Sequence, residues 1–370
     1  MLSILVAANE FKAAIPAMYL GGSQLPYATV AIGVGAVSWV LPASSFRALD
    51  NFMYKTYKRT CLFIFENLSG VTISLYGDID QIKEKKESAL IISNHQSDVD
   101  WAVIDMLAAR QSPEGGENLL RAVVKSAIHF VPLFGWYIYQ HGFIYVRRFG
   151  KYRKEPVDRQ LNYLASMGEP YWLLIFPEGT RYSKKRPDAI EKSNAICEKV
   201  GAPKFNNVLV PRPGGFVTAF EGLSKPETLD AVYDVTIGYG QTRQEGRHGK
   251  APNMLEFVCG NPDYQNIHVH VRRFKPSDVP NDPEECKQWL MERYRAKDKI
   301  MDQFYADGTM PDLCESNAPS ISLSRTLLPA LTFTAALIAP FYSERVRRVY
   351  AYTIASSPFL IAWMHIRGCV

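Results

Sequence analysis

Short apolar runs, each followed by a polar loop, restrict the fold of this sequence more than any other feature. Ala89–Ile92 is wholly apolar and predicts a buried strand. The loop Asn94–Val99 follows it, and apolar side chains then recur at helical spacing up to Leu107. A helix is predicted over Pro156–Met167, and further strands over Gly70–Gly77, Gly142–Val146, Tyr171–Phe176, Val208–Val210, Tyr233–Tyr239 and Ile267–Val271. Strands interspersed with helices predict an α/β domain.

A histidine and an aspartate five positions apart lie where the first of these strands gives way to the helix. His95 is in the loop, and Asp100 is expected about one turn into the helix, within reach of the imidazole. A neutral imidazole can take a proton from a hydroxyl, while a carboxylate on its other nitrogen fixes the tautomer. The pair resembles a hydrolase triad without its serine, which favours a base that activates a substrate hydroxyl. The alternative is that Asp98 or Asp100 caps the helix.

Charged residues follow two more of the predicted strands. Arg148 comes after Gly142–Val146, and Pro177–Arg181 comes after Tyr171–Phe176. Open α/β sheets bind ligands at the carboxyl ends of their strands, so these loops and His95 predict one convergent site. Gly179 permits close backbone approach, and Arg181 offers the paired donors that suit phosphate.

Lys125 stands at the head of an apolar stretch that runs to Trp136. It either guards a lipid or phosphate entrance or begins a core helix that ends at Pro132.

Both ends of the chain carry long uncharged segments. Ala13–Phe46 has no charged residue, and its prolines and glycines predict a tilted helix or a bent two-helix membrane motif. Asp50–Lys58 is then expected to form a membrane-surface helix. Thr326–Ser343 and Val349–Ile366 are also uncharged and predict a transmembrane helical hairpin. We therefore divide the chain into a membrane segment at 1–47, a central domain at 48–315 and the hairpin at 316–370.

Charge and cysteine content exclude some classes of protein. A net charge of +5, from 42 Lys and Arg against 37 Asp and Glu, gives no case for nucleic-acid binding. Six scattered cysteines without a C-x-x-C pair argue against a disulfide framework or a zinc site. His268 and His270 share one strand face, which we interpret as polar rather than metal-binding, and Asp282–Tyr305 is interpreted as a solvated amphipathic helix.

Four stretches together resemble the glycerolipid acyltransferases of the lysophosphatidate type. His95 and Asp100 match the family's H-x4-D motif, and Gly142 through Arg148 match its second motif. Phe176–Arg181 is the complete F-P-E-G-T-R motif, and Val210-Pro211 resemble the fourth. The sequence N-H-Q-S-x-V-D-W at residues 94–101, and the uncharged segments at both ends of the chain, are similar to those of the epsilon branch of the family.

The resemblance implies a mixed sheet flanked by helices, membrane helices at both ends, and transfer of an acyl chain from acyl-CoA to the sn-2 hydroxyl of lysophosphatidic acid. Acyl-CoA would be a co-substrate, with no other cofactor and no metal. Lysocardiolipin or lysophosphatidylinositol are alternative acceptors, and a non-catalytic lipid-binding protein is the alternative class. The resemblance also implies the endoplasmic reticulum membrane, with the mitochondrial outer membrane and the nuclear envelope as alternatives.

The same resemblance implies catalytic and substrate-binding roles for the single residues that match the family's motifs. His95 would be the general base and Asp100 would orient it. The expected substrate-binding residues are Arg148, Glu178, Gly179 and Arg181 at the acceptor phosphate, together with Lys125, Gly142, Thr180 and Pro211. Asp98 is a departure from the motif, and we give it no role.

Overall fold

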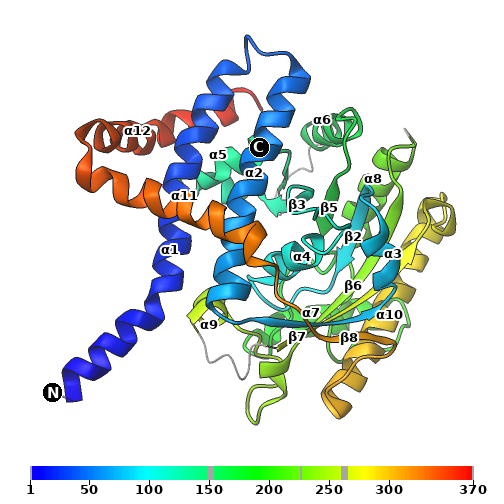
Figure 1. Cartoon of the computed structure of the whole chain (residues 1–370). Coiled ribbons are helices and arrows are strands. Elements are labelled where there is room, and N and C mark those ends of the chain that lie inside the picture. The colour runs from blue at the N-terminus through cyan, green and yellow to red at the C-terminus, as the bar shows by residue number, and fades with distance from the viewer. Residues whose placement is uncertain (1, 148–153, 226, 260–265, 369–370) are drawn as a thin grey trace. The chain divides into compact units, whose positions relative to one another are not determined.

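The computed structural model describes residues 2–147, 154–225, 227–259 and 266–368 (Figure 1). They form two compact units that each combine distant parts of the chain. One unit comprises Met1–Leu68, Glu117–Gly168 and Ile321–Val370, and the other comprises Ser69–Gly116 and Glu169–Ser320. We call them the helical unit and the sheet unit. His95 and Asp100 belong to the sheet unit.

The sheet unit is built on a mixed β-sheet with the strand order β5-β2-β6-β7-β1-β8. β2 lies parallel to β5 and β6, and β1 lies parallel to β7, whereas β6–β7 and β1–β8 are antiparallel. The mixed sheet is thereby confirmed. The strands are β1 (Thr72–Gly77), β2 (Ala89–Ser93), β5 (Trp172–Ile175), β6 (Ala231–Tyr239), β7 (Asn266–Phe274) and β8 (Leu313–Ala318).

Helices occupy the connections between these strands. They are α3 (Ile79–Glu84), α4 (Asp100–Ala108), α7 (Pro187–Lys199), α8 (Pro213–Ser224), α9 (Met254–Cys259) and α10 (Pro283–Asp307). β2, β5 and β6 are buried along their whole length. Burial on both faces explains why β2 and β5 are apolar almost throughout, whereas β6 also contains Asp234 and Thr236. These three neighbouring strands therefore support the loops at their carboxyl ends.

Two predictions for the sheet unit are wrong in detail. Val208–Val210 is not a strand, because the N–H of Leu209 donates to the Glu178 carboxylate and that of Val210 to the Ser193 hydroxyl. Asp100 is the first residue of α4 rather than a residue one turn inside it.

The predicted amphipathic helix is α10, whose exposed face carries residues such as Glu292 and Lys299. Its other face is buried and covers His268, whose ring centroid lies 5.0 Å from that of Phe304. His268 and His270 are buried, and Nδ1 of His268 lies 2.7 Å from the Tyr76 hydroxyl.

The helical unit contains a short parallel pair of strands and most of the chain's apolar helices. The strands are β3 (Leu120–Lys125) and β4 (Ile144–Val146). The helices are α1 (Leu2–Val37), α2 (Ala43–Leu62), a π-helical turn at Phe63–Leu68, a 3-10 turn at Ser126–Phe130, α5 (Phe134–Gln140), α6 (Lys154–Ala165), α11 (Leu323–Tyr342) and α12 (Glu344–Ile366). The predicted helix at Pro156–Met167 and the strand before Arg147 are confirmed.

Several predictions for the helical unit need correction. α1 runs unbroken through Pro16 and Pro26, because packing against α2, α11 and α12 offsets the backbone bonds that these prolines forgo. Asp50–Lys58 is helical as predicted, but most of its side chains are buried within α2: Asp50 accepts a 2.6 Å hydrogen bond from His141, whereas Phe52 is exposed. The helix proposed to end at Pro132 is a 3-10 turn that stops at Phe130.

Among the described residues, α11 is the one helix whose length and composition suffice to cross a membrane. It covers the first half of the predicted hairpin, and α12 covers the second half as a separate helix (Figure 1). The spans expected at residues 1–47 and Val349–Ile366 stay predictions.

Candidate active site

His95 and Asp100 form a hydrogen-bonded pair at the carboxyl end of β2. The Nδ1 atom of His95 lies 2.7 Å from Oδ2 of Asp100. A carboxylate can only accept, so Nδ1 carries the proton and Nε2 is left with a lone pair. His95 retains 18% side-chain exposure, whereas Asp100 retains 1%. The buried aspartate thus orients the imidazole ring through Nδ1, while the ring stays accessible to a substrate.

Asp100 is fixed by more than the histidine. Its carboxylate accepts the backbone N–H groups of Gln96, at 2.8 Å, and of Ser97, at 3.0 Å. The hydroxyl of Tyr239, at the end of β6, donates to Oδ1. Asp100 therefore closes the loop between β2 and α4 around its own carboxylate. It does not cap α4, because both N–H groups that it accepts precede the helix and the start of α4 has no side-chain cap, so the alternative of a capping Asp100 is wrong.

The imidazole is held in its plane by an aromatic neighbour. The Phe176 ring stacks on His95 with 4.2 Å between centroids and 20° between planes. Nε2 has no hydrogen-bond partner within the described parts of the chain. A proton acceptor with a fixed orientation and no internal partner is what a general base requires.

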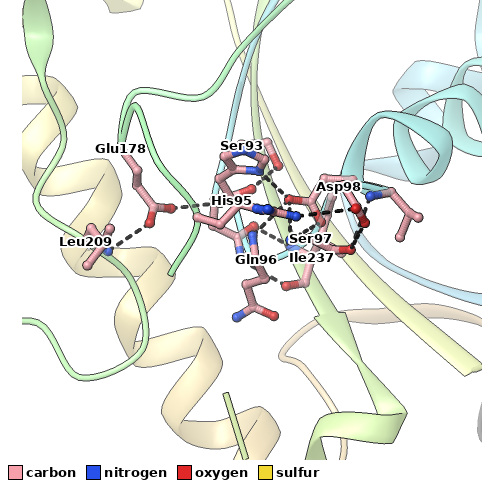
Figure 2. Close-up of polar contacts among 12 residues, drawn as sticks. Ser93, His95, Gln96, Ser97, Asp98, Glu178, Leu209 and Ile237 are labelled. Atoms are coloured by element: carbon pink, nitrogen blue, oxygen red, sulfur yellow. Dashed lines mark hydrogen bonds and ion pairs between the residues drawn. The ribbon is translucent and has the colours of Figure 1, made fainter. Parts of the chain in front are cut away.

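Glu178 ties three loops together (Figure 2). Its Oε1 accepts the N–H of His95 at 2.8 Å, and its Oε2 accepts the N–H of Leu209 at 2.9 Å. Burial raises the pKa of Glu178 to about 8, against the opposing effect of these two donors. Because both oxygens accept backbone N–H groups and the residue is 2% exposed, Glu178 positions the loop of His95, and its predicted contact with the acceptor phosphate stays a prediction.

The strand ends beneath His95 are secured from α10 and β6. Asn94 exchanges two hydrogen bonds with the backbone of Ile237, at 2.8 and 2.9 Å. From α10, Tyr294 donates to the carbonyl of Ser93 at 3.0 Å, and Lys297 donates to that of Ile92 at 3.2 Å. The backbone that leads into His95 is thereby restrained by both α10 and β6.

The loop after β5 brings a guanidinium beside the pair. Gly179 has a φ of +66°, a conformation that favours glycine and lets the loop turn sharply. Nη1 of Arg181 lies 3.4 Å from Oδ2 of Asp98, and Nη1 of Arg186 donates to the Thr180 hydroxyl at 3.0 Å. The Arg181 side chain is 43% exposed, so it remains accessible to an anionic ligand.

The residues expected from the sequence divide between the two units. The sheet unit brings together His95, Asp100, Glu178, Gly179, Thr180, Arg181 and the buried Pro211. Lys125, which is exposed, and Gly142, with a φ of +98°, belong to the helical unit. Arg148 lies outside the described residues. The substrate-binding roles given to these residues stay predictions.

Sequence reasoning missed the partners that reach this site from distant segments. Tyr239 and Lys297 contact it from 139 and 205 residues along the chain from their partners, Asp100 and Ile92. A tyrosine at the end of a predicted strand was a usable signal for Tyr239. Lys297 lies at helical spacing between the buried Tyr294 and Met301, so its place on the apolar face of α10 was a usable signal for its burial.

Known proteins are similar in sequence to this chain along most of its length. Residues 76–239 match the family described as Acyltransferase, and residues 257–335 match Acyltransferase C-terminus. The mouse protein 1-acyl-sn-glycerol-3-phosphate acyltransferase epsilon is 33% identical over 95% of this chain and 95% of its own. The probable 1-acyl-sn-glycerol-3-phosphate acyltransferase 5 of Arabidopsis thaliana is 32% identical over 72% of this chain and 66% of its own.

The human protein 1-acyl-sn-glycerol-3-phosphate acyltransferase delta is 26% identical over 90% of this chain and 84% of its own. A crystal structure of the 1-acyl-sn-glycerophosphate (LPA) acyltransferase PlsC from Thermotoga maritima is 15% identical, with a TM-score of 0.46 over 79% of this chain and 98% of that one. On its likeness to the mouse protein, this chain belongs to the 1-acyl-sn-glycerol-3-phosphate acyltransferase family.

Proposed function

We propose that this protein transfers a fatty acyl chain from acyl-CoA to the sn-2 hydroxyl of lysophosphatidic acid, giving phosphatidic acid. The observation that carries the proposal is the His95–Asp100 pair, with Nδ1 bonded to a fixed carboxylate and Nε2 open. A binding protein has no need of an oriented base, so this geometry also speaks against the non-catalytic alternative.

The pair accounts for every proton in such a transfer. Nε2 of His95 takes the proton of the acceptor hydroxyl while its oxygen attacks the thioester carbonyl. Asp100 stabilises the resulting imidazolium without accepting its proton. The carbon–sulfur bond then breaks, and the CoA thiolate leaves with the proton that His95 returns. No covalent acyl-enzyme is needed, because the acceptor itself supplies the nucleophile.

The acceptor would be a lipid, and the helical unit offers a means of meeting one. α11 is long and apolar enough to cross a membrane, and only 22% of its most apolar 18-residue stretch is buried inside the protein. Exposed apolar side chains continue along α11 and α12, among them Leu328, Phe341 and Phe359. An exposed apolar surface of this kind fits a bilayer partner. We accordingly propose attachment to the endoplasmic reticulum membrane, the compartment expected for this family.

The test is His95→Ala in detergent-purified protein. Loss of a positioned general base should lower the rate of CoA release by about 10²–10⁴-fold when lysophosphatidic acid and acyl-CoA are present. Expression, membrane association and melting temperature should stay near those of the parent protein, because His95 lies at the edge of the fold with 18% of its side chain exposed.

Two controls separate acyl transfer from other activities. CoA release without an acceptor measures thioester hydrolysis, which should remain low in both proteins. An unreactive 2-deoxy analogue of lysophosphatidic acid should bind parent and variant alike, because it lacks the hydroxyl that His95 serves. Transfer within a few-fold of the parent rate in the variant would refute the proposed role of His95 and favour the lipid-binding alternative.

A further inference from the structure

An ion pair joins the two loops that flank the catalytic histidine. Asp98 lies in the loop of His95, and Arg181 lies in the loop after β5, with 3.4 Å between Oδ2 and Nη1. Between the same loops, the backbone N–H of Tyr182 donates to the carbonyl of His95 at 2.7 Å. The backbone therefore holds the two loops together whether or not the ion pair is formed, and the pair is free to serve another purpose.

The two partners of this ion pair are held unequally. The Ser97 hydroxyl lies 3.3 Å from Oδ1 of Asp98 and closer to the carbonyl of Pro252, so its one hydrogen is shared between these two acceptors. Arg181, in contrast, has Asp98 as its single side-chain partner in the part of the chain that the structure describes. A guanidinium has five N–H donors, so most of those on Arg181 remain available to a ligand.

The contact itself is weak. One nitrogen approaches one oxygen at 3.4 Å, which is longer than a charge-assisted hydrogen bond, and the two side chains are 43% and 50% exposed. Exposed pairs of this kind change equilibria by about two- to fivefold. An anion that offers Arg181 a paired acceptor, as a phosphate does, is therefore able to displace Asp98.

We propose that Asp98 is a displaceable counter-ion of Arg181 that sets the headgroup preference of the acceptor site. The inference rests on the proposed function, since it takes the acceptor phosphate to bind at Arg181. Once displaced, the carboxylate of Asp98 stays near the bound phosphate, because its loop is fixed on both sides of Asp98. The N–H of Ser97 donates to Asp100 at 3.0 Å, and the N–H of Val99 donates to the Ser97 hydroxyl at 3.1 Å. It repels that phosphate in proportion to the charge that the phosphate carries.

The consequence is selective. A phosphomonoester such as lysophosphatidic acid carries a charge of about −1.5 to −2 at pH 7, whereas a phosphodiester headgroup carries about −1. If Asp98 weakens binding of the dianion by about fourfold, the same repulsion weakens binding of the monoanion by about twofold. Asp98 thus shifts the acceptor site toward phosphodiester headgroups and away from the free phosphate.

The test compares Asp98→Asn with the parent protein. Asparagine keeps the shape and the acceptor oxygen for Ser97 but removes the charge. The ligands are two unreactive probes, 2-deoxy-lysophosphatidic acid and its methyl phosphodiester, with Kd measured by titration calorimetry in mixed micelles. We expect Kd to fall by about fourfold for the first probe and about twofold for the second, and both gains should shrink at high salt.

The matched control is Asp312→Asn. Asp312 pairs with Arg272 at 2.8 Å, with side-chain exposures of 53% and 48% that resemble those of the proposed pair. It should leave both Kd values unchanged. Weaker binding in Asp98→Asn would mean that Asp98 positions Arg181, and an unchanged Kd or equal gains for both probes would also overturn the proposal.

Acyl transfer by the parent protein distinguishes the two failures. An active parent whose Kd values ignore Asp98→Asn refutes the role of Asp98 and leaves the proposed function standing. If Asp98→Asn binds the probes more tightly than the parent does, but the parent transfers no acyl chain, the proposed function is refuted and the role of Asp98 as a counter-ion stands. A parent that neither binds nor transfers refutes both.

Discussion

Replacing Glu178 by glutamine tests whether this residue holds the catalytic loop or binds the acceptor. The glutamate accepts two backbone N–H groups, from His95 and Leu209. A glutamine fills the same space, but its NH₂ group must face one of those donors. A buried N–H left without an acceptor costs about 1–3 kcal/mol. We therefore expect Glu178→Gln to lower the melting temperature by about 2–10 °C.

The kinetic effect should follow from the loop and not from the ligand. The N–H that loses its acceptor belongs either to His95 or to a residue of the neighbouring loop, so the position of the base suffers. The rate constant kcat should fall, while KM for lysophosphatidic acid and KM for acyl-CoA should change little and together. Glu221→Gln, on the exposed face of α8, is the matched control and should leave both stability and rate unchanged.

The pH dependence of stability gives an independent check. Burial raises the pKa of Glu178 to about 8 in the folded protein, above its ordinary value of 4.5. The folded state then binds more protons than the unfolded state between these values, so stability from this group is fully present below about pH 4.5 and is lost as the pH rises through 8. The difference in melting temperature between parent and Glu178→Gln should accordingly shrink from pH 5 to pH 8.5.

One result would refute this reasoning. If Glu178→Gln kept the parent melting temperature and raised KM for lysophosphatidic acid alone, the residue would face the acceptor phosphate, as its motif had led us to expect. The buried position and the two occupied oxygens would then not describe the working enzyme.

Two further predictions concern the acceptor phosphate and the membrane. Arg181→Lys keeps the charge but loses the paired donors, so KM for lysophosphatidic acid should rise several-fold while KM for acyl-CoA and the melting temperature hold; a lower melting temperature without a selective KM change would make Arg181 a scaffold residue. Deletion of Met1–Arg47 should leave the protein in the membrane fraction after alkaline carbonate extraction, because α11 remains; a soluble product would show that α11 is a core helix.

The parts of the site that were predictable from sequence are those that local patterns encode. The strand Ala89–Ile92 and the helix after it follow from short-range periodicity, and a spacing of five residues was enough to bring His95 and Asp100 together. Gly179 likewise takes the positive φ that its place in a tight loop demanded. Each of these depends on neighbours within a few positions, where the geometry of the chain itself limits the outcomes.

The parts that could not be predicted depend on contacts between distant residues. Val208–Val210 has the composition of a strand, but its backbone donors are used by Glu178 and Ser193, 31 and 17 residues away from the donors. The side chain of Glu178 also accepts the N–H of His95, and this contact was not predicted from the sequence. Periodicity carries no information on which side chain completes a remote hydrogen bond, so the role of a buried polar residue emerges only with the fold.

Lys297 offers the sharpest test of how α10 supports the catalytic strand. Its ammonium group is fully buried, pairs with Asp234 of β6, and donates to the carbonyls of Ile92 and Val235, so it joins the carboxyl end of β2 to the middle of β6. Burial lowers its pKa, and Asp234 opposes that shift. Lys297→Met should cost about 3–5 kcal/mol, because it leaves the charge of Asp234 buried without a partner. Adding Asp234→Asn removes that charge and should restore most of the melting temperature. If Lys297 also positions the loop of His95, the double variant will regain stability but not the full kcat, since the bond to Ile92 is still missing; complete recovery of both would limit Lys297 to neutralising Asp234.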